Sequence, residues 1–296
     1  MSLRVALALL VAAGPAAAAP EYREVRDDTG AVVRVDAENC RIVSLAPGTT
    51  AMLYGAGAGA CLIGTIAHSK EPAEAAKLPV IGDVETLDFE RLLVLRPTVV
   101  VVAVDVVQRA RIDRIQALGI PVYQVHVTQL AGMPASLRRL GELTGTAAVA
   151  NATAEALEAD LESLRTRYQR RAPIRVLYQI WDRPIYTVGG RHLITDALRL
   201  CGATNIFGDL KTAAPAITRE AVLARDPQLI IASAPRESAK QWLEQWRDYP
   251  NLDAVRRRNL VSYSDERIDR MGPSVIAATE QLCRTIDPAR SAAGGR

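Results

Sequence analysis

The chain has 296 residues, of which 49% are hydrophobic and 23% are charged, so it is long enough to bury one large core or two moderate ones. Its formal net charge is only +3, and its basic residues are scattered apart from one tight run, Arg256-Arg257-Arg258, which has no aromatic residues interleaved with it. This pattern argues against a nucleic-acid-binding protein and fits a solvated helix end at that run.

Residues 1–19 have the features of a cleaved secretory signal peptide. One basic residue precedes an apolar run, and Ala17-x-Ala19 stands before Pro20. The run of about ten apolar residues is too short to cross a bilayer, and no later stretch reaches about 18. Because this segment has no cysteine to carry a lipid, we expect an exported, soluble protein, with an uncleaved anchor as the alternative.

Residues 20–144 are expected to form a first α/β lobe in which short strands alternate with helices. The expected strands are a hairpin at 21–36, with Asp28-Thr29-Gly30 at its turn, and buried strands at 40–45, 61–65, 98–103 and 122–125. The expected helices are 51–57, 89–96, 112–118 and 134–143. Residues 66–70 and 79–85 are expected to be loops at the rim of the sheet.

Two blocks of sequence resemble each other and indicate an internal repeat. In the block that begins at Phe89 and in the block that begins at Arg219, a glutamate lies seven residues before a proline, with a helical pattern between them and a buried strand after. Asp88 and Thr218 are the expected N-caps, and each proline is expected to end its helix. The chain therefore looks like two related α/β lobes.

Residues 145–171 lie between the two blocks and are expected to form one long helix. The segment is rich in Ala, Leu, Glu and Arg, contains no proline, and repeats its apolar residues at helical spacing. A helix of that size spans about 40 Å, the width of a small domain. We interpret it as a brace between the lobes, with an ordinary surface helix as the alternative.

Residues 172–296 are expected to form the second α/β lobe. The expected strands are 175–180, 185–187, 228–233 and 260–263, and the expected helices are 192–200, 219–226, segments around Trp242 and Asn251, and 273–286. Alternating strands and helices predict a mostly parallel sheet covered on both faces in each lobe. The predicted fold is α/β, with two Rossmann-like lobes, and ligands of such sheets bind beyond the carboxyl ends of the strands.

The four cysteines are far apart in the sequence and show no metal-ligand spacing. In an exported protein they are expected to form disulfides, and three pairings are possible. Pairing within each lobe, Cys40 with Cys61 and Cys201 with Cys283, is favoured, and free buried thiols are the alternative.

Motifs of the common enzyme classes are missing from the sequence. There is no P-loop, no dinucleotide-binding GxGxxG after a strand, no HExxH and no GxSxG. The histidines His68, His126 and His192 are far apart and form no local metal cluster. Nothing in the sequence requires an enzyme.

Several blocks together resemble the periplasmic binding proteins that feed iron-siderophore, haem and vitamin B12 importers, and among these the vitamin B12-binding proteins most. The blocks are residues 41–57, 87–103, the central helix, 185–190, 198–207, 217–233 and the last helix with its EQLC. The resemblance implies a class III binding protein, with lobes joined by one stiff helix, little lobe closure and a corrinoid in the cleft. It also implies a periplasmic monomer with no cofactor of its own, and it places the family's disulfide on Cys201 and Cys283.

In the resembled family the two repeated glutamates, here Glu90 and Glu220, dock on arginines of a dimeric membrane permease that works with ATPase subunits. A two-fold permease offers two equivalent basic sites, and a two-lobed protein can present one carboxylate to each. The alternative is that each glutamate only favours a helix N-terminus.

The resemblance places the ligand-binding rim at His68, Val84, Trp181 and residues 265–270, with Asp265, Arg267 and Arg270 able to meet polar groups of the ligand. Tyr186 is a further candidate. This chain has His68, Val84 and Ala214 where vitamin B12 binders often have a tyrosine and two tryptophans, so a flat ring would lose apolar contact there.

His68 could also approach the metal of a cobalamin or haem as an axial ligand, although a hydrogen-bonding rim residue is the more ordinary role for a loop histidine. Within the family, the alternative ligands are haem and a ferric siderophore, which a tyrosine such as Tyr186 or Tyr263 near the ring would favour. A remote alternative is a metal-cluster oxidoreductase subunit, which would need cysteine ligands at the lobe edges.

Overall fold

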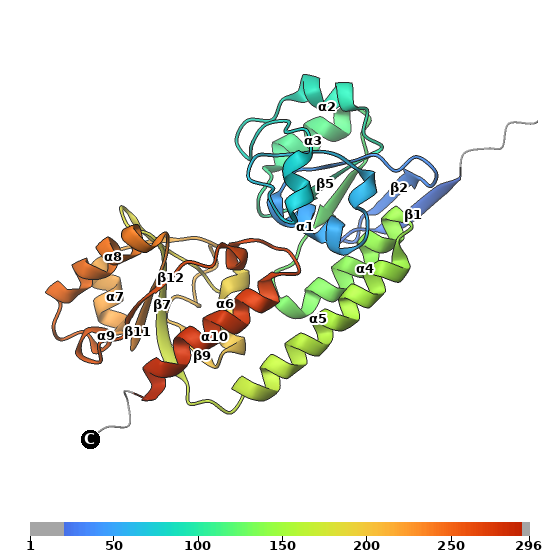
Figure 1. Cartoon of the computed structure of the whole chain (residues 1–296). Helices are drawn as coiled ribbons and strands as arrows, with labels where there is room; N and C mark the ends of the chain where they lie inside the picture. The colour runs from blue at the N-terminus through green and yellow to red at the C-terminus, as the bar shows by residue number, and fades with distance from the viewer. Residues whose placement is uncertain (1–20, 292–296) are drawn as a thin grey trace, which may run out of the picture.

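The computed structural model describes residues 21–291 and has the predicted α/β architecture (Figure 1). The two larger sheets lie in separate parts of the molecule, which a long helix joins. The elements from β1 to α4 are called the N lobe here, and those from β7 to α10 the C lobe. The predicted signal peptide, residues 1–19, lies outside the described residues. Among these residues, none of the helices has both the length and the apolar character that crossing a bilayer requires.

The N lobe contains a four-stranded parallel sheet in the order β4-β3-β5-β6 and a separate antiparallel hairpin. The strands are β1 (Tyr22–Arg26), β2 (Val32–Asp36), β3 (Ile42–Ser44), β4 (Leu62–Thr65), β5 (Val99–Ala103) and β6 (Val122–Val125). All residues of β5 are buried, as expected for a strand covered on both faces. Helices pack on both sides of the sheet.

The helices of the N lobe are α1 (Pro47–Gly55), α2 (Phe89–Leu95), α3 (Arg109–Ala117) and α4 (Met133–Thr144), with short 3-10 turns η1 (Gly59–Cys61), η2 (Ala73–Lys77) and η3 (Leu130–Gly132). Two predicted boundaries were wrong. The first helix begins at Pro47 and not at Ala51, because proline is well suited to the first helical turn. The third begins at Arg109 and not at Ile112, before its first buried residue.

The C lobe has a mixed sheet in the order β10-β8-β7-β11-β12, with β9 also paired to β7. Its strands are β7 (Ile174–Trp181), β8 (Ile185–Thr187), β9 (Ala203–Asn205), β10 (Ala216–Ile217), β11 (Leu229–Ser233) and β12 (Leu260–Tyr263). Strands β7, β9, β11 and β12 are parallel, whereas β8 and β10 are antiparallel to their neighbours. The sequence patterns did not predict β9 and β10, which have only three and two residues.

The helices of the C lobe are α6 (Leu193–Leu200), α7 (Arg219–Arg225), α8 (Arg236–Glu244), α9 (Asp253–Arg256) and α10 (Val275–Ser291), with 3-10 turns η4 (Gln245–Asp248) and η5 (Glu266–Asp269). The last helix begins two residues later than predicted and continues past Ile286. It includes Pro288 within its final turns, which made its end hard to place from the sequence.

Helix α5 (Ala147–Tyr168) lies within the predicted segment 145–171 and connects the lobes. Gly145 is not part of it, because it ends α4 in the left-handed conformation with a φ of 75°. The buried residues of α5 recur at helical spacing and are Ala150, Ala154, Leu157, Leu161, Leu164 and Tyr168. Its apolar stripe therefore continues along almost the whole helix.

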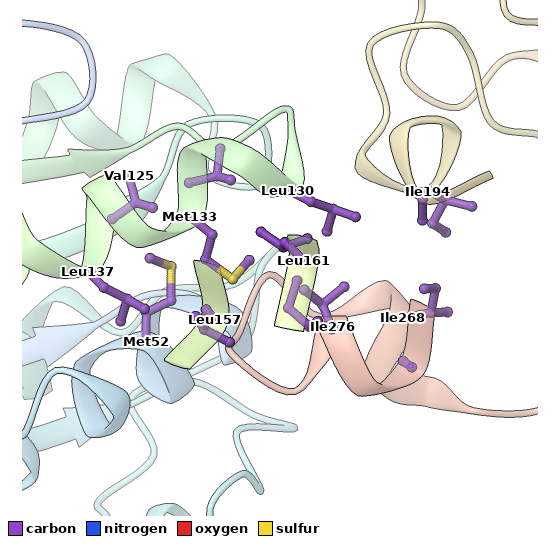
Figure 2. Packing of buried hydrophobic residues seen from close by; sticks show 14 of the residues in the cluster. Met52, Val125, Leu130, Met133, Leu137, Leu157, Leu161, Ile194, Ile268 and Ile276 are labelled. Carbon is purple, nitrogen blue, oxygen red and sulfur yellow. The ribbon is translucent and has the colours of Figure 1, made fainter. Parts of the chain in front are cut away.

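One hydrophobic core runs through both lobes along α5. Figure 2 shows Leu157 and Leu161 of α5 between Met133 of the N lobe and Ile276 of the C lobe, and all four belong to one cluster of buried residues. Two further clusters cover the opposite faces of the two sheets, one under α2 and α3 and one under α7 and α8. Because the shared core is apolar and continuous, α5 acts as a structural brace.

The repeated blocks form the same local structure in both lobes. The side chain of Asp88 accepts a hydrogen bond from the Arg91 amide, and Thr218 accepts one from the Ala221 amide, so both predicted N-caps are confirmed. Helices α2 and α7 each have seven residues and are followed by a residue with positive φ and then by the proline. The repeat predicted from the sequence is therefore also a structural repeat.

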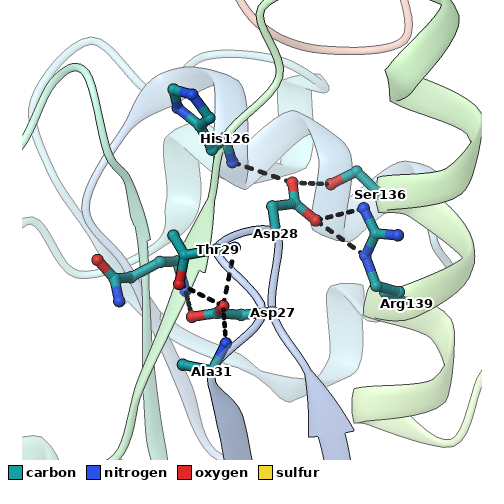
Figure 3. A network of polar contacts seen from close by, with 8 residues as sticks. Asp27, Asp28, Thr29, Ala31, His126, Ser136 and Arg139 are labelled. Atoms are coloured by element: carbon teal, nitrogen blue, oxygen red, sulfur yellow. Dashed lines mark hydrogen bonds and ion pairs between the residues drawn. The ribbon is translucent and has the colours of Figure 1, made fainter.

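Buried carboxylates fix the β1–β2 hairpin to the rest of the N lobe (Figure 3). Asp27, directly before the predicted turn, accepts hydrogen bonds from the amides of Thr29 and Ala31. Asp28 accepts two hydrogen bonds from the Arg139 guanidinium, at 2.9 and 2.6 Å, and one from the Ser136 hydroxyl, at 2.7 Å. The hairpin is thus held against α4.

Both favoured disulfides, Cys40–Cys61 and Cys201–Cys283, are present. They leave no free cysteine among the described residues, which removes the thiolate ligands that a metal-cluster subunit would need.

Candidate functional site

The predicted ligand-binding residues follow the carboxyl ends of the parallel strands in both sheets. His68 lies three residues after β4, Trp181 is the last residue of β7, and Asp265 lies two residues after β12. Ligands of open parallel sheets bind beyond this edge. The structure places these candidates at the edge where the predicted function needs them, although they are far apart in the sequence.

A buried network of hydroxyl groups supports the loop that carries His68. Thr50 donates to Ser44 at 2.9 Å, Thr50 and Thr65 share a hydrogen bond of 2.9 Å, and Thr65 donates to Ser69 at 2.8 Å. Because these side chains are almost fully buried and satisfy one another, they fix the ends of β3 and β4 and the start of the loop.

His68 itself is exposed and has a left-handed backbone with a φ of 68°. This conformation is uncommon for residues other than glycine and costs some free energy. A strained, exposed residue on a well-supported loop is a reasonable candidate for ligand contact. Within residues 21–291, no hydrogen bond or ion pair joins His68 to the candidates in the C lobe.

Val84 lies in the loop before α2 and is 38% exposed. The Arg111 guanidinium on α3 donates to the backbone carbonyls of Val84 and Glu85 and so anchors this loop. The side chain of Val84 offers a small apolar surface.

Trp181 is the most exposed of the large hydrophobic residues at the carboxyl edges, at 57%. It lies opposite Tyr186 of β8 in the strand register, and Tyr186 in turn lies opposite Ala216 of β10. Its ring also meets the edge of the Trp242 ring, with centroids 6.1 Å apart and planes at 62°. The structure thus places the two candidates Trp181 and Tyr186 side by side and adds Trp242 from α8.

Trp242 was missed as a site residue because it lies 61 positions after Trp181 and belongs to an amphipathic helix, where a tryptophan is ordinarily a core residue. No local motif connects the two residues. Only the packing of α8 against β11 and β12 of the same sheet brings the two rings together.

The segment from Asp265 to Arg270 is rich in charged side chains that pair with each other. Arg267 donates to both carboxylate oxygens of Asp265, at 2.8 and 2.6 Å, and Arg270 donates to Glu266 at 2.8 Å. The hydrogen bonds from Arg267 hold the pKa of Asp265 below its usual value, although partial burial acts in the opposite direction. The predicted polar residues Asp265, Arg267 and Arg270 therefore lie together.

Asp269 is the acidic group of this segment that has no ion pair in the described part of the chain. It lines a hollow of about 190 Å³ at the carboxyl ends of β11 and β12, together with Ser233, Tyr263 and Asp265. Its side chain reaches solvent, but protein surrounds much of it in this concave surface. Loss of water contact, followed by the charge of Glu266, raises its pKa to about 6.

The C lobe touches the N lobe directly beside this segment. Arg270 lies 3.9 Å from the carboxylate of Glu71, in the loop before η2. Met271, Gly272 and Pro273 then follow α1 so closely that a Cβ on Gly48 would lie 2.8 Å from the Met271 amide nitrogen. Glu71 was not a predicted site residue, because its contact comes from the other lobe and leaves no pattern in the local sequence.

A larger hollow of about 540 Å³ lies at the amino-terminal end of β7 and is not the proposed site. Its three arginines already have partners in the protein: Arg225 pairs with Asp209, Arg199 with Asp196, and Arg175 with the Asp226 carbonyl. It is a solvated surface at the edge of the sheet opposite to the predicted binding residues.

Glu90 and Glu220 occupy the same position in α2 and α7, the second residue of each helix, and both side chains are exposed. Figure 1 shows the two helices in separate lobes. Hydrogen bonds from its own amide and from the Thr218 hydroxyl lower the pKa of Glu220 below its ordinary value.

Comparisons with known proteins agree with this architecture. Residues 42–266 match the family described as periplasmic binding protein. The chain is 29% identical over 246 residues to the vitamin B12-binding protein of Yersinia pestis, covering 83% of this chain and 86% of that protein.

Two solved structures have a similar fold. The periplasmic vitamin B12 binding protein of Vibrio cholerae is 27% identical, with a TM-score of 0.78 over 85% of this chain and 98% of that one. The periplasmic heme-binding protein of Roseiflexus sp. RS-1 is 21% identical, with a TM-score of 0.72 over 84% and 98% of the two chains. At that identity, the second likeness concerns the fold alone.

Proposed function

The chain belongs to the periplasmic binding protein family, and on that basis we propose that it captures cobalamin or a related corrinoid and delivers it to the permease of an ABC importer. The observation that carries the family assignment is the match over residues 42–266 together with the two-lobed fold. Such a protein is a binding protein and not an enzyme, and it carries its ligand as cargo.

The charge of the rim supports a corrinoid over haem or an anionic ferric siderophore. Glu71, Asp265, Glu266 and Asp269 supply four carboxylates, and Lys70, Arg267 and Arg270 supply three positive charges. The carboxylates of haem would be repelled by this excess of negative charge. The amide side chains of cobalamin are neutral, and their N–H groups can donate hydrogen bonds to carboxylates.

Apolar contact is the second support for this ligand. Trp181 is 57% exposed at the carboxyl edge of the C-lobe sheet and Tyr186 lies beside it, so the pair offers aromatic surface to a flat macrocycle. In this proposal Val84 adds apolar contact from the N lobe, and Asp265, Arg267 and Arg270 orient the polar edge of the ligand.

We propose His68 as a rim contact from the N lobe. Its exposed imidazole on a supported loop can donate or accept a hydrogen bond, and it can also coordinate the metal ion of the bound ligand. The visible absorption of aquacobalamin separates these roles. A band shift with the wild type that His68→Ala abolishes indicates ligation of the metal. Identical spectra together with a weaker Kd for His68→Ala indicate hydrogen bonding alone, and an unchanged Kd rejects the contact.

Delivery would use the exposed carboxylates of Glu90 and Glu220, one on each lobe, as anchors for a two-fold permease. The protein would reach the periplasm by means of residues 1–19 and act there as a monomer.

Calorimetric titration of the mature protein with cyanocobalamin tests the proposed ligand, with hemin and a ferric siderophore titrated in parallel. The proposal expects tight one-to-one binding of cyanocobalamin and much weaker binding of the two others. Tight binding of hemin or of the siderophore instead would reject the corrinoid and keep the transport role.

A further inference from the structure

We infer that Trp242 is a positioning residue for ligand binding: it holds the Trp181 ring so that one face stays open to a flat macrocycle. The inference rests on the proposed function and adds to it a residue from α8, outside the strands and loops of the rim. The geometry of the two rings carries it.

The two indole rings form a defined pair. Their centroids are 6.1 Å apart and their planes are inclined at 62°, an edge-to-face arrangement that the charge distribution of aromatic rings favours. Trp181 nevertheless remains 57% exposed, so Trp242 covers only part of it. An indole that is restrained on one side and free on the other is suited to receive a flat apolar ligand.

The backbone around Trp181 is fixed independently of this ring pair. The Gln179 side chain donates to the Trp181 carbonyl at 3.2 Å and accepts a hydrogen bond from the Trp246 indole at 3.0 Å. Asp182 accepts a hydrogen bond from Gln245 at 2.9 Å. The two bonding partners, Gln245 and Trp246, belong to η4, which directly follows α8. They therefore fix the position of the end of β7 relative to α8, the helix that carries Trp242.

The remaining freedom of Trp181 lies in its side-chain torsions. An exposed tryptophan without a neighbour would populate several rotamers and would lose that freedom when a ligand orders it. Contact with Trp242 removes part of this cost before the ligand arrives. Trp242 therefore strengthens binding through Trp181, without being required to touch the ligand.

The experiment is a double-mutant cycle on the full mature chain with cyanocobalamin as the probe. The variants are Trp181→Ala, Trp242→Ala and the double variant, with Trp242→Phe as the conservative change and Lys240→Ala as an exposed control on the same helix. Calorimetry gives Kd, and far-ultraviolet circular dichroism follows the exciton couplet expected of two close indoles. Thermal unfolding shows whether each variant is folded.

We expect Trp242→Ala to weaken binding by about fivefold, a size typical of an aromatic pair. In the Trp181→Ala background the same change should have no further effect on Kd. The couplet should disappear in both single alanine variants. Trp242→Phe should stay within about twofold of the wild type because it keeps a ring at the edge of Trp181, and Lys240→Ala should be unchanged.

An unchanged Kd in a folded Trp242→Ala variant, or an equal loss in both backgrounds, would overturn the positioning role while leaving the proposed function intact. A wild-type protein that does not bind cyanocobalamin would reject the proposed corrinoid ligand, and the inference with it. If Trp242→Ala does not fold, Trp242→Leu replaces it, because leucine fills part of the space but has no aromatic ring. A loss of affinity that disappears in the Trp181→Ala background supports the inference, and an unchanged Kd or a loss that persists there overturns it.

Discussion

The guanidinium of Arg139 on α4 holds the carboxylate of Asp28 in the β1–β2 turn by two hydrogen bonds, at 2.9 and 2.6 Å (Figure 3). The Asp28 side chain is only 2% exposed, whereas Arg139 keeps 34% exposure. This pair connects the first hairpin to a helix more than a hundred residues later, so it is a long-range contact that stabilises the N lobe.

Replacing Asp28 by Asn keeps the shape of the side chain and removes its charge. The Arg139 guanidinium then loses its partner while it stays partly out of water, so we expect the free energy of unfolding to fall by about 2 kcal/mol. Chemical denaturation measures this change. Asp113→Asn is the matched control, since Asp113 pairs with Arg109 on the surface and should change stability by less than about 0.5 kcal/mol. Equal losses in the two variants would contradict the prediction.

The pH dependence of stability should differ in sign between Asp269 and Asp265. The pKa of Asp269 is raised to about 6 in the folded protein from an ordinary 3.8. Between these values the folded state binds more protons than the unfolded state, so this group lowers stability as the pH rises from about 4 to about 6, and its ionised form remains unfavourable above that. We therefore expect Asp269→Asn to raise Tm at pH 7.5, by about 1 to 2 °C because the group still reaches solvent.

The benefit of Asp269→Asn should shrink as the pH falls through 6, when the wild-type carboxyl takes up its proton in the fold. Asp265 should behave in the opposite way. Its pKa is lowered by Arg267, so its contribution is favourable at neutral pH and is lost only in acid, below its ordinary pKa. Asp265→Asn should thus lower Tm at pH 7.5. Thermal melts from pH 5 to 8 without ligand test both signs, and a shift in the same direction for both variants would refute them.

The contact between the lobes should be sensitive to a single methyl group. A Cβ on Gly48 would lie 2.8 Å from the Met271 amide nitrogen and 3.1 Å from its carbonyl carbon, so backbone must move to accept Gly48→Ala. We expect a loss of about 1 to 3 kcal/mol in the free energy of unfolding, as for overpacked interiors. Denaturant titration provides the measurement.

Gly132→Ala is the control for that change, because a Cβ at Gly132 meets nothing within 4 Å and its φ is −81°. It should be neutral or slightly stabilising. If Gly48→Ala is as stable as Gly132→Ala, the lobes are not held together at α1.

Charge removal at Glu90 and Glu220 should separate transport from binding. In cells that depend on this protein for cobalamin uptake, Glu90→Ala together with Glu220→Ala should lower uptake by at least about tenfold, since two charge-assisted contacts with the permease are lost. Calorimetry with cyanocobalamin should give an unchanged Kd. Glu142→Ala, an exposed glutamate on α4, is the control and should retain full uptake. Loss of ligand affinity in the double variant would argue that the glutamates serve the cleft and not the permease.

The features that follow from local sequence were predicted well. Two capped helices that end before Pro97 and Pro227 could be recognised because capping, helix spacing and proline act over a few residues. Helix α5 was visible for the same reason, since an apolar stripe over many turns leaves a periodic pattern.

The parts that were missed depend on contacts between distant segments. The Trp181–Trp242 pair and the approach of Arg270 to Glu71 are produced by packing, and each partner alone looks like an ordinary core or surface residue. Strands β9 and β10 have too few residues to show an alternation, and they exist because longer neighbours offer them a free edge.

Among the described residues, the two lobes meet through the continuous core along α5 and through residues 270–273 against α1. They also meet where η3 contacts α6, since the Leu130 amide donates to the Asp196 carboxylate at 2.9 Å. A molecule joined in this way presents its rim already assembled. Its apparent affinity is therefore not reduced by a population of molecules in a conformation that cannot bind. We expect the outer helices α2 and α7 to keep the same separation with and without ligand. A transporter that reads only that separation would receive empty carriers as readily as loaded ones, and the free carrier would compete with the loaded one for the same membrane sites.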